Sequence, residues 1–276
     1  MVIKENITIP ELTGDTKRRL YIYLPTDMKS EKRYPVLYMF DGHNVFYDED
    51  ATYGKSWGMK RYLDITEAKL IVVAVECNHE GCGRLHEYSP FPCPRMKPEP
   101  LKGLGGVYMD WMVKSLKPYI DSHFPTLSDR THTYIAGSSM GGLMTVYALA
   151  VYNDIFSRGA ALSPSLWIGS TKVMEMIKNA QLQADTWLYM DYGSEELNSH
   201  NKTKMLSIFK RAANAFMDGG AYVCSRIIPG GTHCEASWEQ QIPIFMQCLG
   251  ITSQIPEVND YDVHWDDEQK TKYFRI

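Results

Sequence analysis

Five consecutive residues combine types and spacing that suit nucleophilic chemistry. Gly137-Ser138-Ser139-Met140-Gly141 fits the pattern Gly-x-Ser-x-Gly. The residues before it, 131–136, are mostly β-branched or aromatic, as in a short buried strand, and residues 142–150 are rich in helix formers. Glycines two residues either side of Ser139 permit a strained strand-to-helix turn that exposes the hydroxyl. The spacing therefore predicts that Ser139 is a nucleophile.

A nucleophilic serine needs a base, and His233 is the best placed of the eight histidines. It follows a predicted strand that ends at Ile228, and the small-residue loop Pro229-Gly230-Gly231-Thr232 leads into it. A loop of this kind can hold an imidazole over the end of a sheet. We therefore predict that His233 is the general base.

The third member of such a site is a carboxylate between the serine and the histidine in chain order. Residues 186–191 have the composition of a strand, and Tyr192-Gly193-Ser194-Glu195-Glu196 follows. Asp191 is expected to point into the sheet because it ends the strand. Either glutamate lies in a loop that can reach the imidazole, and the residues alone do not separate Glu195 from Glu196.

The elements that must position these groups alternate between apolar runs and helical patterns. Residues 19–25 alternate like an edge strand, whereas 34–40 and 70–75 are continuously apolar, as in strands buried on both faces. Further strands are predicted at 158–163, 186–191 and 221–228, and helices at 107–122, 202–217 and 238–249, with Pro118 bending the first helix. This order predicts an α/β fold with a mostly parallel sheet of about eight strands and helices on both faces.

The length of 276 residues suits a single domain over 1–276. Between about 77 and 106 the composition changes to proline, glycine, charge and aromatics, which indicates an irregular excursion. The segment from about 253 to 276 mixes acidic and aromatic residues, which fits a peripheral strap or a homodimer contact and equally a loosely packed tail.

The composition excludes several classes of partner. The net charge of −4 leaves no broad basic surface, so we expect no nucleic acid. No apolar run approaches the roughly 18 residues of a membrane span, so we expect no membrane contact. No export signal is evident at the start of the sequence, so a cytoplasmic location with six free cysteines is expected.

One short cluster raises the question of a metal. Cys77-Asn78-His79-Glu80-Gly81-Cys82 offers thiolates and an imidazole, which are zinc ligands. No second close pair completes a tetrahedral set at a familiar spacing. The sequence therefore predicts no metal site.

Several blocks together resemble the putative esterase family of α/β-hydrolases, which includes esterase D, feruloyl esterases, enterochelin-type esterases and the antigen-85 mycolyltransferases. The resemblance covers roughly residues 20–250. It rests on the blocks at 38–46 (YMFDGHNVF), 87–90 (EYSP), 119–121 (YID), 137–142 (GSSMGG), 163–165 (SPS) and 230–233 (GGTH). The family more often has glutamine where this chain has His43.

The resemblance implies roles for individual residues. It makes Ser139 the nucleophile and His233 the base, and it selects Glu196 as the acid. The backbone N–H groups of Met140 and His43 are expected to bind the negative oxygen of the intermediate. No metal or organic cofactor is required. From their positions, Asn44, Trp57 and Trp167 are candidate contacts of the substrate pocket, with a place in the core as the equal alternative for each tryptophan. For Arg84 and Glu87, on the excursion, we favour solvated charges over a position at the rim of the cleft.

Three functions are compatible with these residues. The leading one is hydrolysis of a small or carbohydrate-linked acyl ester through an acyl-enzyme. The second is transfer of the acyl group to an alcohol or sugar, as in the antigen-85 relatives. The third is a binding module that keeps the fold without catalysis, which the presence of all three triad residue types disfavours.

Overall fold

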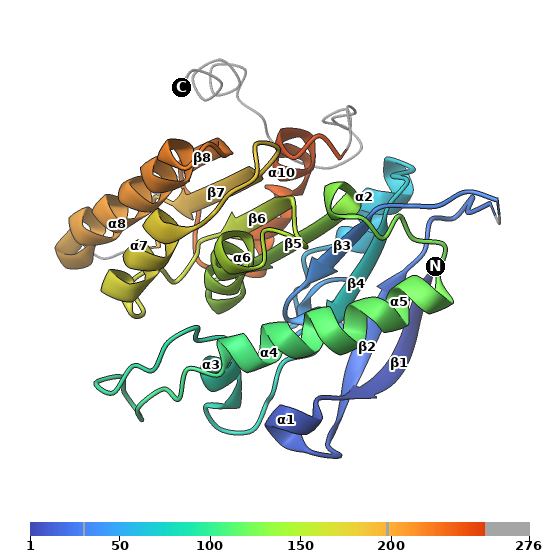
Figure 1. Ribbon diagram of the computed structural model, residues 1–276, viewed down its shortest axis with the longest axis horizontal. Helices are drawn as coiled ribbons and strands as arrows, with labels where there is room; N and C mark the ends of the chain where they lie inside the picture. The colour runs from blue at the N-terminus through green and yellow to red at the C-terminus, as the bar shows by residue number, and fades with distance from the viewer. Residues whose placement is uncertain (30, 197–198, 252–276) are drawn as a thin grey trace.

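The computed structural model describes residues 1–29, 31–196 and 199–251 (Figure 1). The C-terminal segment expected at about 253–276 lies outside the described residues. Eight strands form one sheet in the order β1-β2-β4-β3-β5-β6-β7-β8. The strands are β1 (Val2–Thr8), β2 (Lys17–Tyr23), β3 (Val36–Met39), β4 (Ile71–Val75), β5 (Thr133–Ser138), β6 (Arg158–Leu162), β7 (Trp187–Gly193) and β8 (Tyr222–Ile228).

Antiparallel pairing occurs only at the β1 side of the sheet. Strands β1, β2 and β4 pair antiparallel, and every pair from β4 through β3 to β8 is parallel. The α/β prediction with about eight mostly parallel strands is therefore confirmed. The prediction that residues 19–25 form an edge strand is wrong, because β1 covers that side through seven residue pairs from Val2↔Tyr23 to Thr8↔Lys17.

Helices cover both faces of the sheet. They are α1 (Pro10–Thr13), α2 (Met59–Ile65), α3 (Gly83–Glu87), α4 (Gly105–Trp111), α5 (Lys117–His123), α6 (Met140–Val151), α7 (Ser170–Asn179), α8 (Ser199–Asp218), α9 (Glu235–Glu239) and α10 (Ile242–Cys248). Short 3-10 turns are η1 (Gly42–Asn44) and η3 (Arg130–His132). Among the described residues, no helix is long and apolar enough to cross a membrane.

The continuously apolar strands supply two cores at once. In β4, Ile71, Val73 and Val75 pack into the core beneath helices α4 to α8, which lie on the near side of the sheet in Figure 1. Val72 and Ala74 pack into the opposite core, together with residues of α2, α9 and α10. A strand whose two faces are both covered has no polar alternation, which is why these runs were recognisable in the sequence.

The helix predicted at 107–122 runs from 105 to 123 and changes register in the middle. Residues Met112–Leu116 (η2) form a π-helical segment between α4 and α5. Pro118 is the second residue of α5 and has no N–H to donate. The wider π turn directly before it accommodates the ring, so the expected bend takes the form of a π segment.

The irregular excursion is anchored to the sheet by a buried ion pair. Glu87 at the end of α3 accepts a hydrogen bond from Arg18 of β2 at 2.6 Å, and their side chains are 2% and 3% exposed. Glu87 also accepts from the backbone N–H of Asn78 at 2.8 Å. Glu87 is therefore a structural residue, and the interpretation of it as a solvated charge is wrong.

We expect Glu87→Gln to lower the free energy of unfolding by about 3–5 kcal/mol, because it leaves the Arg18 charge buried without its partner. Lys114→Gln is the matched control, because the Lys114–Asp110 pair lies on the surface, with side chains 70% and 48% exposed. It should change stability by less than about 1 kcal/mol. Urea unfolding of both variants checks this, and equal losses would contradict it.

Candidate active site

Ser139 lies in a tight turn between β5 and α6 and has φ 56° and ψ −117°. The turn is tied to β6, because the Ser139 N–H donates to Leu162 O at 2.9 Å. A Cβ on Gly137 would lie 2.8 Å from the carbonyl carbon of Gly141, and one on Gly141 would lie 2.9 Å from Phe40 Cβ. The two glycines of the motif are therefore required by close packing. The predicted strand, turn and helix are confirmed as secondary structure.

Glu196 and His233 contact each other although 37 residues separate them. His233 Nδ1 lies 2.8 Å from Glu196 Oε2. A carboxylate only accepts, so Nδ1 carries the proton and Nε2 is left as the basic nitrogen. The His233 side chain is 41% exposed, whereas that of Glu196 is 1% exposed. The pair therefore joins a solvent-accessible base to a buried acid.

The buried carboxylate of Glu196 is held by further donors. Its Oε1 accepts from the backbone N–H of Gly193 at 2.7 Å and from the hydroxyl of Ser163. Ser163 in turn accepts from the indole N–H of Trp238 at 2.9 Å. These bonds fix the direction of the carboxylate. The sequence reasoning missed the parts played by Ser163 and Trp238.

The two competing carboxylates lie elsewhere. Glu195 is next to Glu196 in the loop, but its carboxylate accepts from Ser194 Oγ at 2.9 Å. Asp191 is 1% exposed and accepts from Tyr189 Oη at 2.8 Å and from the Ser163 N–H at 3.0 Å. Burial raises the pKa of Asp191 to about 7, assisted by the charge of Glu196 and opposed by the two donors. Asp191 therefore faces into the sheet, as the sequence predicts.

Ser139 and His233 both line a cavity of about 570 Å³. Within the described residues, the hydroxyl of Ser139 contacts Ser165 Oγ at 3.4 Å, and no hydrogen bond joins it to His233. Such bonds are often long in ligand-free enzymes and shorten when substrate binds. The cavity therefore holds a serine hydroxyl and an imidazole, and the imidazole is joined to a buried carboxylate.

Two backbone segments offer N–H groups beside Ser139. Met140 begins α6, so its N–H has no acceptor within the helix. His43 lies in the 3-10 turn η1, which follows Asp41 in the left-handed conformation with φ 56°. A Cβ on Gly42 would lie 2.6 Å from Ala74 O, so η1 packs directly on β4. Since η1 follows β3 and α6 follows β5, both predicted anion-binding segments lie at the carboxyl ends of central parallel strands.

An ion pair holds η1 in place. Arg84 Nε and Nη2 donate to the two oxygens of Asp41 at 2.6 and 2.7 Å. Burial acts to raise the pKa of Asp41, but the facing guanidinium outweighs it and the pKa lies below the ordinary value. Arg84 also lines the cavity. The interpretation of Arg84 as a solvated charge is therefore wrong.

The predicted pocket contacts separate into two groups. Asn44 lines the cavity, and its amide donates to Glu235 Oε1 at 3.2 Å. Neither Trp57 nor Trp167 is among the described residues that line this cavity. Trp57 is 3% exposed and packs in the core at 6.0 Å from the ring of Trp238, whereas Trp167 is exposed at the surface. Trp238 is the tryptophan that lines the cavity, and its ring packs edge-on to His233.

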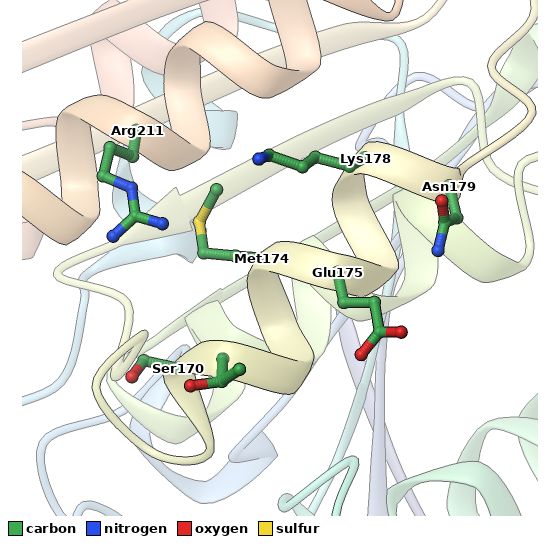
Figure 2. Close-up of a pocket in the computed structure, with 7 residues that line it drawn as sticks. Ser170, Met174, Glu175, Lys178, Asn179 and Arg211 are labelled. Carbon is green, nitrogen blue, oxygen red and sulfur yellow. The ribbon is translucent and has the colours of Figure 1, made fainter.

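A second hollow, of about 400 Å³, lies between α7 and α8. Figure 2 shows Met174 and Lys178 of α7 on one side of it and Arg211 of α8 on the other. It shares no wall residue with the cavity beside Ser139. We therefore take the Ser139 cavity as the candidate active site.

Comparisons with known proteins agree with this architecture. The family model described as "Putative esterase" matches residues 12–245. The uncharacterized protein YbbA of Bacillus subtilis (strain 168) is 24% identical over 183 residues, which are 65% of this chain and 69% of YbbA.

Two solved structures illustrate the similarity of fold. The BES protein from Bacillus cereus has a TM-score of 0.67 and 20% identity, covering 92% of this chain and 95% of that chain. An IroE-like serine hydrolase from Shewanella oneidensis has a TM-score of 0.68 and 22% identity, covering 86% and 76%. At this level of identity the two structures show the shared α/β-hydrolase fold.

The raised pKa of Asp191 has a sign that can be tested. Because the native pKa is about 7 and the ordinary value is 3.8, the unfolded chain loses the Asp191 proton first as pH rises. The free energy of unfolding of the parent, relative to that of Asp191→Asn, should therefore be greatest below pH 4. It should fall by a few kcal/mol by pH 7, because each unit of pKa difference corresponds to about 1.4 kcal/mol. Urea unfolding of both proteins across this range checks it, and parallel pH profiles would contradict it.

Proposed function

The chain belongs to the putative esterase family, and on this premise we propose that it is a serine esterase whose catalytic triad is Ser139, His233 and Glu196. The observation that carries the proposal is the 2.8 Å contact between His233 Nδ1 and the buried Glu196 carboxylate, at the wall of the cavity that also contains Ser139. This contact fixes the tautomer that a base needs.

In the proposed mechanism, the Ser139 oxygen attacks the ester carbonyl while His233 Nε2 removes the hydroxyl proton. Glu196 orients the ring and stabilises the imidazolium that forms. The turn geometry supports this role, because Ser139 precedes the N-terminus of α6, where the helix dipole favours developing negative charge. His233 then gives the proton to the leaving alcohol, and an acyl-enzyme remains.

The backbone N–H groups of Met140 and His43 are the proposed donors to the oxyanion. The proposal is supported by the contacts that hold both residues in place. Met140 is fixed by α6, and His43 by the packing of η1 on β4 and by the Asp41–Arg84 pair. Donors that are fixed before substrate binds need no reorganisation during the reaction.

Water is the proposed acyl acceptor. The His233 side chain is 41% exposed, so water can reach the base that must activate it. The same base deprotonates water, which attacks the acyl-enzyme and releases the acid. This exposure favours hydrolysis over transfer of the acyl group to a second alcohol.

We infer that the substrate is a small or carbohydrate-linked ester from the chemistry of the cavity walls. The walls carry several polar and charged side chains, among them Asn44, Thr52, Lys55, Asn78, Arg84 and Glu235. Such groups suit hydroxyl-bearing substrates, whereas a long alkyl chain needs an apolar lining.

Ser139→Ala should lower kcat by at least about a thousandfold, because no nucleophile remains. Glu196→Gln should lower it by a similar factor, because the amide no longer fixes the tautomer of His233. Glu195→Gln is the matched control, since this carboxylate contacts Ser194 and not the imidazole. Steady-state kinetics on an acetyl ester checks all three variants. Full activity of Ser139→Ala, or equal loss in both glutamate variants, would overturn the triad.

A panel of acetyl, butyryl, long-chain and feruloyl esters tests the substrate inference. We expect kcat/KM to fall at least about tenfold from acetyl to long-chain acyl groups, because a long alkyl chain would desolvate charged wall residues such as Lys55, Arg84 and Glu235. Acetylated sugars should be hydrolysed as well. A preference for the long-chain esters would contradict the inference.

A further inference from the structure

Three potential metal ligands meet at the wall of the cavity. They are His43 of η1 and, after β4, Cys77 and His79, and one ligand atom from each lies within 4.8 Å of the other two. The rings of His43 and His79 are in edge-to-face contact, with centroids 4.6 Å apart. Cys82, the other cysteine of the sequence cluster, is not a member of this group. The fold thus supplies His43, which lies 34 residues before Cys77 in the chain.

The imidazole of His43 has an unusual hydrogen-bonding state. The residue is 4% exposed, and its Nδ1 is buried without a hydrogen-bond partner. Its Nε2 is occupied by Thr52 Oγ1 at 3.0 Å. Burial lowers the pKa of His43, which keeps the ring neutral and able to ligate a cation. A buried, unpaired ring nitrogen is costly unless a ligand completes it.

His79 has the same division of roles between its ring nitrogens. Its Nε2 contacts Glu76 Oε1 at 3.2 Å. Histidines that bind metals commonly have one nitrogen held by a carboxylate or another acceptor, and the other nitrogen then binds the ion. Thr52 and Glu76 therefore serve as outer partners that leave one nitrogen of each ring for a cation.

We propose that His43, Cys77 and His79 bind a zinc ion at the wall of the active-site cavity. Two imidazole nitrogens and one thiolate form a set that zinc favours over oxygen-seeking cations such as magnesium. In tetrahedral zinc sites the ligand atoms lie about 3.5 Å apart, so the group, whose ligand atoms lie within 4.8 Å of one another, closes further on binding. Three protein ligands leave one coordination position for water or another small ligand.

Binding releases a proton and involves no redox step. Burial raises the pKa of the Cys77 thiol, with Asp41 acting in the same direction, so the thiol is protonated before the ion arrives. Zinc displaces that proton to solvent as the zinc–sulfur bond forms. The ligand set then carries one negative charge against the two positive charges of the ion.

Occupancy of the site should slow ester hydrolysis, a consequence that rests on the proposed function. The three ligands line the same cavity as Ser139 and His233, so a bound ion and its water fill space that the ester needs. His43 also contributes a proposed oxyanion donor through its backbone. The zinc site itself does not depend on the triad.

Cobalt(II) serves as a spectroscopic probe and zinc as the ligand in the binding test. Titration of the metal-free full-length chain with cobalt should give visible bands of a tetrahedral site and a thiolate charge-transfer band, saturating at one equivalent. Zinc should displace the cobalt, and magnesium should not. Absence of both bands, or their persistence after excess zinc, would overturn the proposal.

Variants assign the signal to the site. Cys77→Ser should remove the charge-transfer band. His79→Gln should weaken zinc binding by at least about tenfold, and because the His79 side chain is 52% exposed this variant spares the core. Cys82→Ser and His132→Gln are the matched controls. A site that survives both Cys77→Ser and His79→Gln, or is lost equally in the controls, would refute the assignment.

The cysteine pair Cys224 and Cys248 is a second potential thiol site, with sulfurs 2.9 Å apart. Cys224→Ser should therefore bind cobalt as the parent does, and loss of the band in this variant would overturn the proposal.

Ser139→Ala should also bind zinc with unchanged affinity, because Ser139 is not a ligand. Unchanged binding in an inactive Ser139→Ala separates the zinc site from the triad. In the parent enzyme, saturating zinc should lower turnover at least about tenfold, and unchanged turnover would refute the inhibition.

Discussion

The strained backbone of Ser139 is the constraint on which the site depends. A serine at φ 56° and ψ −117° is held in a conformation that costs about 1–3 kcal/mol. Hydrogen bonds from Ser139 N–H to Leu162 O and from Ser165 N–H to Ser139 O oppose relaxation of the turn. The neighbouring glycines have no room for a side chain. The turn therefore needs glycine at both positions of the motif because it is closely packed. It places the Ser139 hydroxyl at the start of α6.

The parallel sheet brings the remaining groups to that hydroxyl. Ser163 follows β6, Gly193 ends β7, and His233 lies in the loop after β8. The carboxyl ends of parallel strands lie at one edge of a sheet, so residues far apart in the chain converge there. Glu196 is the centre of this convergence, since it contacts all three. The Glu196 carboxylate is thus positioned by contacts within the protein itself.

Much of the fold was predictable because buried strands leave a strong signal. Residues 34–40 and 70–75 are apolar throughout, since both faces of β3 and β4 are covered. Strand β1 gave no such signal, because Lys4, Glu5 and Asn6 interrupt its apolar pattern at the sheet edge. The π segment before Pro118 was not predicted either. The proline indicated that the helix bends, but not that the bend is a π-helical turn.

The candidate site was predictable only where chain order or a motif constrained it. Glu195 and Glu196 are chemically identical neighbours, and only the path of the loop directs Glu196 to the imidazole. The bond between Trp238 and Ser163 spans 75 residues and leaves no local pattern. The grouping of His43 with Cys77 and His79 likewise leaves no local pattern, because His43 joins the two through tertiary folding.

The most direct test of the account is covalent labelling with a fluorophosphonate probe, followed by mass spectrometry of the labelled peptide. A serine that is activated by His233 and Glu196 should form one adduct, on Ser139, and Glu196→Gln should slow its formation. Labelling should disappear in the heat-denatured protein, because the chemistry depends on the fold. Failure of the native protein to react, or an adduct on another serine, would contradict the account.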